Sequence, residues 1–317
     1  MSNSRKMKTP KQIMEEFRES LLKMKPDGDS LTAFHKTFRK VADQFDTPGP
    51  EMKSMRDVDI PTSEGNITAR LYEPFDIPDA PGATFIYLHG GGFVSCDVDT
   101  HDGICRRVAS GGGMRVLSVE YRLAPEFPFP AAVDDCEAAL KWALDGRGLD
   151  HGIEPKNLAL GGDSAGGNMT AYLTQKYRQD LRAQVLYYPL MQMAEFKPVK
   201  PGPQDMLQLG VIALKFIDEH YVVDADPLDP RLSPLFEKDL VGIPPTFLLT
   251  CGLDPLRQEG KAYGEKLRAA GVKVTDVHES LMPHGFLNFA RAFPRAKKIP
   301  LDTADFLREY LQFPEDK

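Results

Sequence analysis

The sequence has few of the features that mark membrane proteins or proteins that bind nucleic acids. No uninterrupted apolar run approaches the roughly 20 residues that a membrane-spanning helix needs. Basic residues are outnumbered by acidic ones, and the formal net charge of -7 leaves no basic stripe that could follow a phosphate backbone. We therefore expect neither a nucleic acid partner nor a stable membrane anchor.

Cysteine is also scarce, and its spacing fits no metal site. The 317 residues contain four cysteines, no two of which form a C-x-x-C pair. This pattern is typical neither of a zinc site nor of a dense disulfide framework. We expect four free thiols and no bound metal. These cysteines are Cys96, Cys105, Cys136 and Cys251.

The polar residues 1–10 lack the apolar stretch and the small-residue cleavage site of a secretory signal, which predicts a cytoplasmic protein. Hydrophobic residues make up 42% of the chain and charged residues 27%, as in ordinary folded domains. Length alone allows either one large domain or two modest ones.

Two amphipathic helices are predicted before the main domain. Thr9 and Gln12 can form a capping box with Pro10 at the first helical position, and apolar residues then recur at helical spacing over 9–25. A second apolar stripe of the same period covers 31–45. Residues 66–72 alternate like a strand after a turn, which predicts a hairpin.

From residue 84 onward, short apolar strands alternate with helical segments. Strands that are apolar without interruption are typical of a sheet buried on both faces, and their alternation with helices favours a parallel, doubly wound α/β fold. The predicted strands cover 84–88, 116–121, 157–160, 184–188, 246–250 and 273–278. The predicted helices between them include 132–144, 165–177 and 260–270.

One segment breaks this alternation. A proline- and glycine-rich stretch at 198–203 precedes an apolar helical run at 206–221, which we interpret as an insertion above the sheet. The predicted organisation is then an N-terminal helical part that contributes to a cap, one catalytic domain in two pieces, and a cap insertion. Their boundaries are 1–50, 51–195 with 226–317, and 196–225.

A strand-to-helix turn carries the first chemical motif. Gly162-Asp163-Ser164-Ala165-Gly166 follows the strand at 157–160 and precedes a helix. This is the context in which G-x-S-x-G forms a nucleophile elbow, with the serine hydroxyl raised above the sheet. An ordinary glycine-rich turn is the alternative.

A second glycine-rich loop, His89-Gly90-Gly91-Gly92, ends the strand at 84–88. This is where a loop that stabilises an oxyanion would lie if Ser164 is the nucleophile. A phosphate-binding loop is the alternative, but no G-x-G-x-x-G spacing opens a helix here and no Walker lysine follows.

A serine nucleophile needs a general base, and His284 is the best candidate for that base among the seven histidines of the chain. In this architecture the acid and then the histidine follow the serine in the chain, which leaves His220, His278 and His284. Only His284 lies in a loop just past the last predicted strand.

Asp254 directly follows the strand at 246–250 and is the predicted acid that orients His284. Three other aspartates lie in a proline-rich loop, where they are better explained as solvated turn residues. They are Asp224, Asp226 and Asp229.

Together the motifs resemble the hormone-sensitive-lipase-like family of α/β hydrolases, in particular bacterial acetyl esterases and short-chain carboxylesterases. The resemblance covers about residues 60 to 315 and rests on the following segments: His89-Gly-Gly-Gly-Phe93, Asp99-Thr-His-Asp102, Tyr121-Arg-Leu-Ala-Pro-Glu126, Gly162-Asp-Ser-Ala-Gly-Gly167, Ser233-Pro-Leu235, Asp254-Pro-Leu-Arg257 and His284-Gly-Phe286.

The resemblance implies an α/β-hydrolase fold with a helical cap and an oxyanion hole made by the backbone N–H groups of Gly90, Gly91 and Ala165. It also implies no metal or organic cofactor. Three positions depart from the usual family pattern, namely Cys96, Gln258 and Leu281. The residues that we expect near the substrate are His89, Gly92, Phe93 and Asp163.

The predicted reaction is hydrolysis of short-chain carboxylic esters through an acyl-serine intermediate. A small-molecule ester is therefore the expected partner, and a homodimer is allowed. Hydrolysis of an amide or arylformamide by the same residues is the first alternative. A binding module without catalysis is the second, and the presence of His284 speaks against it.

Overall fold

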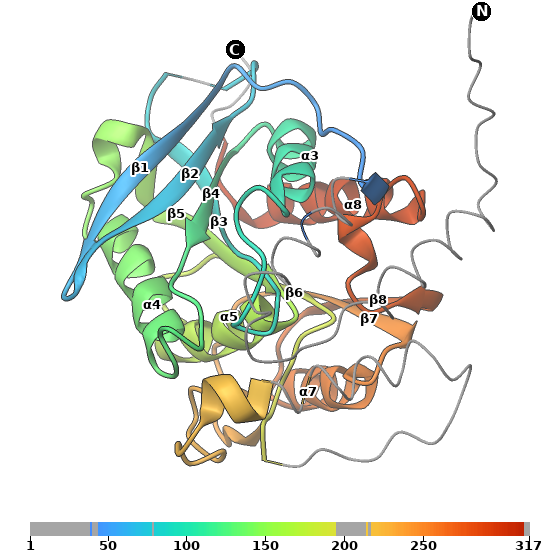
Figure 1. Ribbon diagram of the computed structural model, residues 1–317. Helices are drawn as coiled ribbons and strands as arrows, with labels where there is room; N and C mark the ends of the chain where they lie inside the picture. Colours follow the sequence, from blue (N-terminus) through green and yellow to red (C-terminus); the bar gives the residue numbers. More distant parts are fainter. Residues whose placement is uncertain (1–38, 40–43, 78, 195–213, 215–216, 314–317) are drawn as a thin grey trace, which may run out of the picture.

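The computed structural model describes residues 39, 44–77, 79–194, 214 and 217–313. Eight strands form one sheet in the order β1-β2-β4-β3-β5-β6-β7-β8 (Figure 1). The first pairings, β1 with β2 and β2 with β4, are antiparallel, and the remaining pairings are parallel. The strands are β1 (Ser54–Thr62), β2 (Gly65–Glu73), β3 (Gly82–Leu88), β4 (Arg115–Glu120), β5 (Ile153–Asp163), β6 (Ala183–Tyr187), β7 (Thr246–Leu253) and β8 (Val274–Pro283).

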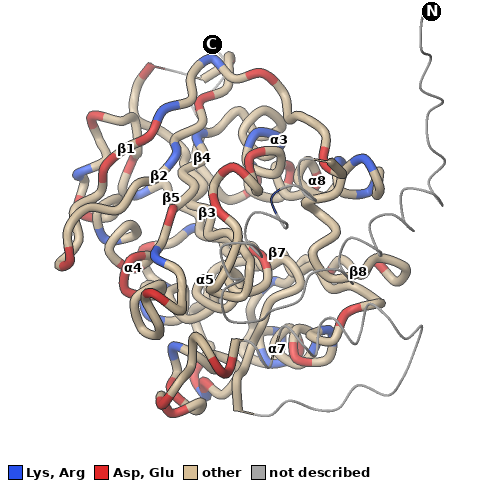
Figure 2. The backbone as a smooth tube through the Cα atoms, in the orientation of Figure 1, with Lys and Arg blue, Asp and Glu red and all other residues tan. Residues whose placement is uncertain are grey.

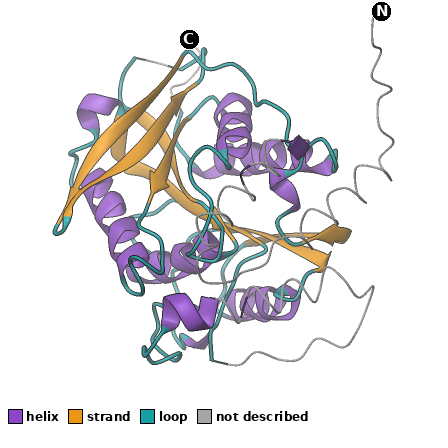
Figure 3. Ribbon diagram, in the orientation of Figure 1, coloured by secondary structure: helices purple, strands orange, loops and turns teal. Residues whose placement is uncertain are grey.

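Helices cover both faces of the sheet (Figure 3). Residues of α3 and α8 share one core cluster with the sheet, while residues of α4, α5 and α7 form clusters on the opposite face. The helices are α3 (Asp102–Gly112), α4 (Ala131–Leu144), α5 (Ala165–Lys176), α7 (Arg257–Ala269) and α8 (Arg295–Tyr310). Within the described residues, the short helical segments are η2 (Leu149–His151), η3 (Asp218–Val222), η4 (Pro234–Phe236) and η5 (Phe286–Asn288).

Strand β3 shows why the central strands read as uninterrupted apolar runs. Its side chains alternate between the two faces, with Phe85 and Tyr87 in the cluster that contains α3 and α8, and Ile86 and Leu88 in the cluster that contains α4 and α5. All four are fully buried. Both faces of this strand are therefore hydrophobic, as expected for a doubly wound sheet.

The predicted fold class is confirmed, and the differences concern the ends of elements. The predicted strand at 273–278 continues in β8 to Pro283, and the predicted helix at 260–270 begins earlier, at Arg257. The hairpin is present as β1 and β2, which pair from Ser54 with Glu73 to Thr62 with Gly65.

The predicted cap lies largely outside the described residues. The helix at 9–25 is wholly outside them, and of the helix at 31–45 only residues 39, 44 and 45 are described. Of the insertion at 196–225, the structure describes residues 214 and 217–225, which include η3. The domain boundaries and the cap therefore stay predictions.

The parallel strands place four functional segments at one edge of the sheet. Residues that follow the carboxyl ends of β3, β5, β7 and β8 must meet at this edge, which is where open α/β sheets bind their ligands. These segments contain the predicted oxyanion loop, Ser164, Asp254 and His284.

All four cysteines are buried free thiols, as predicted.

Basic and acidic residues are interspersed along the described backbone (Figure 2). Within the part of the chain that the structure describes, no helix is both long and apolar enough to cross a membrane.

Candidate active site

Ser164 occupies a sharp turn between β5 and α5. Its backbone has φ 54° and ψ -115°, a conformation that non-glycine residues adopt only where the surrounding structure enforces it. The flanking glycines allow the turn to form. A Cβ on Gly162 would lie 2.4 Å from the carbonyl oxygen of Leu88, and one on Gly166 would lie 1.9 Å from the same atom. The motif therefore forms a strained elbow packed against the end of β3.

His284 lies within hydrogen-bonding distance of both other predicted triad side chains. His284 Nε2 is 2.8 Å from Ser164 Oγ, and His284 Nδ1 is 2.9 Å from Asp254 Oδ2. Asp254 is held in turn by the backbone N–H of Leu256, which donates to Oδ1 at 2.8 Å. Each carboxylate oxygen of Asp254 thus has a defined partner.

Burial differs along this chain of hydrogen bonds. The side chain of Asp254 has no exposed surface, whereas that of His284 is 29% exposed. Burial alone lowers the pKa of His284, but the charge of Asp254 and its hydrogen bond outweigh burial, so that the pKa is raised above its ordinary value. The arrangement makes His284 a stronger base than an isolated buried imidazole.

The predicted oxyanion loop needs one correction. The N–H of Gly90 donates to Asp163 Oδ1 at 2.7 Å, so it does not face a substrate. Among the described residues, no acceptor is found for the N–H groups of Gly91 and Gly92. Ala165 is the first residue of α5, where an N–H has no partner within the helix. The candidate donors are therefore Gly91, Gly92 and Ala165, one residue further along the loop than predicted.

The loop cannot accept larger residues at its glycines. Gly91 has φ 114° and Gly92 has φ 64°, in the region that favours glycine. A Cβ on Gly90 would lie 2.4 Å from Asp163 Oδ2. The loop also turns at Cys96, which has φ 69°. A positive φ favours glycine, which explains why the family commonly has glycine at the position that Cys96 occupies.

Two residues predicted to contact substrate point into the protein instead. His89 is fully buried and stacks on Tyr121, with ring centroids 4.1 Å apart, while the Tyr121 hydroxyl donates to the His89 carbonyl oxygen at 2.7 Å. The carboxylate of Asp163 accepts hydrogen bonds from the Tyr87 hydroxyl and from Gly90. His89 and Asp163 therefore support the loop from behind. Tyr121, which directly follows β4, braces the loop through these contacts with His89.

Phe93 lies where the loop meets the described part of the insertion. Its ring stacks on that of Tyr221 in η3, with centroids 4.0 Å apart and planes 6° apart. Tyr221 also contacts Phe129, whose N–H donates to the Tyr221 carbonyl oxygen at 3.0 Å. Ile217 of the insertion approaches the loop as well, since a Cβ on Gly92 would lie 2.8 Å from Ile217 Cδ1. The end of the insertion thus packs directly against the candidate oxyanion loop.

The other two departures from the family pattern lie away from these contacts. Leu281 is 76% exposed near the end of β8, and Gln258 is exposed on the first turn of α7. Of the two rejected histidines, His278 lies within β8 and bonds Thr250 Oγ1 at 2.9 Å, and His220 lies in η3. Neither is part of the triad geometry.

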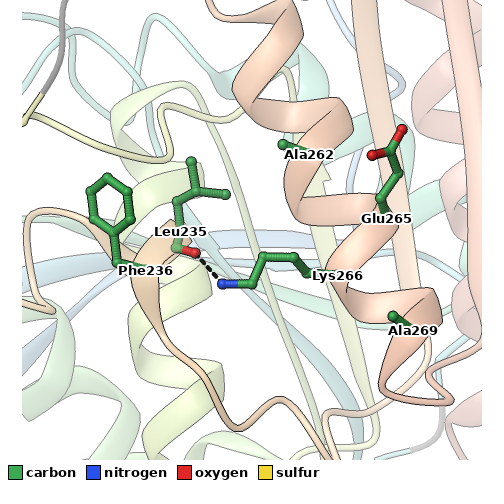
Figure 4. Close-up of a pocket in the computed structure, with 6 residues that line it drawn as sticks. All are labelled: Leu235, Phe236, Ala262, Glu265, Lys266 and Ala269. Atoms are coloured by element: carbon green, nitrogen blue, oxygen red, sulfur yellow. Dashed lines mark hydrogen bonds between the residues drawn. The ribbon is translucent and has the colours of Figure 1, made fainter.

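A pocket of about 520 Å³ lies between η4 and α7 (Figure 4). None of the triad residues lines it. Its lysine, Lys266, donates to the carbonyl oxygens of Leu235 and Glu237 at 2.5 and 2.6 Å.

Within the described residues, no group of three or more His, Cys, Asp or Glu side chains is arranged to hold a metal ion.

Comparison with known proteins finds related α/β hydrolases. A family model for the α/β hydrolase fold matches residues 85–288. The carboxylic ester hydrolase LipN of Mycobacterium tuberculosis is 37% identical over 274 residues, which are 82% of this chain and 71% of that protein. The ethyl acetate hydrolase of Pseudomonas putida is 31% identical over 287 residues, which are 88% of each.

Among solved structures, the ester hydrolase EH1AB1 from the metagenome of Lake Arreo, complexed with a bipyridine phosphonate derivative, has a TM-score of 0.85 and 32% sequence identity. The match covers 95% of this chain and 97% of that one.

Proposed function

Because the chain belongs to the hormone-sensitive-lipase-like family of α/β hydrolases, we propose that it is a serine carboxylesterase that prefers short-chain acyl esters. The observation that carries the proposal is the continuous hydrogen-bonded series from Ser164 through His284 to Asp254, with distances of 2.8 and 2.9 Å. The names of the similar proteins, which include carboxylic ester hydrolases and an ethyl acetate hydrolase, support the same reaction class.

In this reaction Ser164 Oγ attacks the ester carbonyl carbon while His284 Nε2 takes the hydroxyl proton. The tetrahedral intermediate collapses when His284 gives that proton to the departing alkoxide, which leaves an acyl-serine. Water then attacks the acyl carbon while His284 takes one of its protons. His284 returns that proton to Ser164 Oγ as the bond between Oγ and the acyl carbon breaks, which releases the carboxylic acid and restores the free enzyme. Asp254 holds Nδ1 protonated and stabilises the imidazolium without taking its proton.

Charge that develops on the carbonyl oxygen needs donors that are already in place. The N–H groups of Gly91, Gly92 and Ala165 are the proposed oxyanion hole. One such donor is worth roughly 3 to 4 kcal/mol in the transition state of other hydrolases. The loop therefore contributes to catalysis on the same scale as the base.

Replacement of the proposed nucleophile tests this function. Ser164→Ala is expected to abolish hydrolysis of aryl acetates and butyrates with no loss of fold, because the side chain sits in a turn and not in the core. Ser110→Ala on the exposed face of α3 is the matched control and should keep wild-type rates. Turnover by the Ser164 variant within tenfold of wild type would remove the serine from the mechanism.

Matched ester and amide substrates separate the proposal from the amide alternative. Both would use the same three residues, so only the relative rates distinguish them. We expect kcat/KM for an aryl ester to exceed that for the amide of the same acyl group and aromatic ring by several orders of magnitude. Equal or reversed values would make the chain an amidase.

The preference for short acyl chains is proposed from the packing around the oxyanion loop. Ile217, Phe93 and Tyr221 bring the insertion close to the proposed donors, which favours a bounded acyl pocket. Each methylene adds about 0.8 kcal/mol only while it can be buried, so kcat/KM should rise with chain length and fall once the pocket is full.

A series of p-nitrophenyl esters from acetate to palmitate measures this preference. The expected optimum lies between acetyl and hexanoyl. Efficient cleavage of palmitate, at the rate seen with butyrate, would instead indicate an open groove of the lipase kind.

A further inference from the structure

A second histidine–aspartate pair lies beneath the oxyanion loop and takes no part in the triad. His101 Nε2 is 3.2 Å from Asp163 Oδ1, and the two side chains are 1% and 4% exposed. Asp163 immediately precedes Ser164, and His101 immediately precedes α3. A buried pair of this kind costs desolvation energy, so its presence calls for a specific purpose.

Hydrogen bonding at Nδ1 of His101 requires a proton on that nitrogen. The Thr100 hydroxyl lies 3.0 Å from Nδ1, but it donates its only proton to the Asp97 carbonyl oxygen at 2.7 Å. It can therefore only accept from His101. The Asp97 carbonyl oxygen, itself 3.4 Å from Nδ1, is a second acceptor on this side of the ring.

At Nε2 the ring faces a carboxylate, which is also an acceptor, so this nitrogen carries a proton as well. The side-chain amide of Asn288 lies 3.0 Å from the same nitrogen. Its Oδ1 is buried without a partner among the described residues, and exchanging the amide oxygen and nitrogen would give Nε2–H a second acceptor. Both ring nitrogens thus face acceptors, which is the environment of a charged imidazolium.

The neighbouring charges agree with this protonation state. Burial lowers the pKa of His101, but the Asp163 carboxylate outweighs burial and the net pKa is raised. Burial and the nearby His101 together lower the pKa of His89 to about 4, so His89 is the neutral member of these two neighbouring imidazoles, whose ring centroids are 5.6 Å apart. Asp46 and Asp97 also interact with the charge of His101.

The pair is connected to the oxyanion loop by one oxygen atom. Asp163 Oδ1 forms the ion pair with His101 Nε2, and it accepts hydrogen bonds from the Tyr87 hydroxyl at 2.8 Å and from the Gly90 N–H at 2.7 Å. Gly90 immediately precedes the two proposed donors. A carboxylate that shifted or lost its charge would release Gly90 and with it the position of Gly91 and Gly92.

We propose that His101 is a positioning residue: as a buried cation beneath the loop, it holds the Asp163 carboxylate against the Gly90 N–H and thereby fixes the oxyanion donors at Gly91 and Gly92. This inference rests on the proposed esterase function. It adds to that function a buried ion pair that never touches substrate.

His101→Gln tests the proposal because glutamine keeps a neutral donor but removes the charge. Displacement of oxyanion donors by a fraction of an ångström to 1 Å predicts a loss of roughly 10- to 100-fold in kcat with KM unchanged. Binding of an aryl trifluoromethyl ketone, whose tetrahedral adduct places an oxygen in the oxyanion hole, should weaken by the same factor as kcat/KM. His278→Gln in β8 is the matched control and should change none of these values.

A second variant completes the test. Asp163→Asn keeps an oxygen that can accept from Gly90 and Tyr87, but it removes the negative charge of the pair. We expect the same loss of kcat with KM unchanged, so this variant tests the proposal if His101→Gln does not fold. Since the pair acts as a unit, the double variant should lose no more kcat than the worse single variant. Losses that multiply would overturn the coupling.

The outcome also distinguishes this proposal from the esterase assignment. Turnover by Ser164→Ala within tenfold of wild type would refute the function itself. An inactive Ser164→Ala together with wild-type kcat and wild-type ketone affinity in folded His101→Gln and Asp163→Asn would refute only the role of His101. A fall in melting temperature without a change in kcat would likewise overturn it, because it would make the pair purely structural.

Discussion

Asp254→Asn should be the most informative conservative change in the triad, because the structure fixes how the new amide must lie. In the wild type, Oδ1 accepts from the Leu256 N–H and Oδ2 faces His284 Nδ1. The amide oxygen must take the Oδ1 position to keep the first bond, which turns the NH₂ group toward His284. Nδ1 then has to be an acceptor, and the proton moves to Nε2, where it faces Ser164.

This tautomer cannot accept the serine proton. The expected loss is on the order of 10⁴ in kcat, by analogy with serine proteases, which corresponds to about 5 kcal/mol of transition-state stabilisation. The fold should persist because the variant is isosteric and keeps the bond to Leu256. Stopped-flow or steady-state hydrolysis of p-nitrophenyl butyrate, with circular dichroism as a check on folding, gives the measurement.

Asp229→Asn is the matched control. Asp229 is paired with Arg231 at 2.8 Å in the loop after the insertion, and within the described part of the chain no hydrogen bond or ion pair joins it to the triad. Its replacement should change kcat by less than about threefold, as for an ordinary surface ion pair. Equal and small losses in the two variants would mean that another residue orients His284.

Three further predictions follow from the electrostatics. The raised pKa of His284 places the acid limb of the kcat/KM profile above pH 6.5, because only the neutral imidazole acts as base. Asp254→Asn should move this limb to lower pH, because it removes the charge that raises the pKa. A limb that does not move would contradict the assignment of Asp254. Burial raises the pKa of the Cys96 thiol, so iodoacetamide at neutral pH should leave activity intact and alkylate this cysteine only in urea. Burial raises the pKa of Glu259 to about 8, so the folded state binds this carboxyl proton more tightly than the unfolded state does. The resulting contribution to the unfolding free energy is fully present below the unfolded pKa of about 4 and is lost as pH rises through about 8. Unfolding free energies of Glu259→Gln should accordingly depend less on pH than those of the wild type between about pH 5 and 9, and parallel curves would exclude this carboxyl.

The sequence was most informative where one local feature determines the structure. Strands such as 84–88 are apolar because both faces of the sheet are covered, and their order along the chain fixes which loops meet. The order of Ser164, Asp254 and His284 then selected three residues of which the structure brings the first two within 2.9 Å of the histidine ring. Their roles in catalysis stay a proposal.

Long-range contacts were not predictable in the same way. Nothing in the motif reveals that Asp163 reaches Gly90, a contact across 73 positions that moves the proposed donors from Gly90 and Gly91 to Gly91 and Gly92. His101 is a similar case. The segment Asp99-Thr-His-Asp102 marked it as part of the resemblance, but only the packing of α3 against the sheet brings its ring to Asp163.

Covalent trapping of the nucleophile tests the central proposal most directly. A p-nitrophenyl alkylphosphonate should react with the native protein in a 1:1 ratio, release one equivalent of p-nitrophenol and leave the phosphonyl group on the peptide that contains Ser164. The unfolded protein and Ser164→Ala should not react, since the hydroxyl is activated only by His284 in the folded site. A phosphonate found on a different residue, or an equal extent of labelling in Ser164→Ala, would contradict the account.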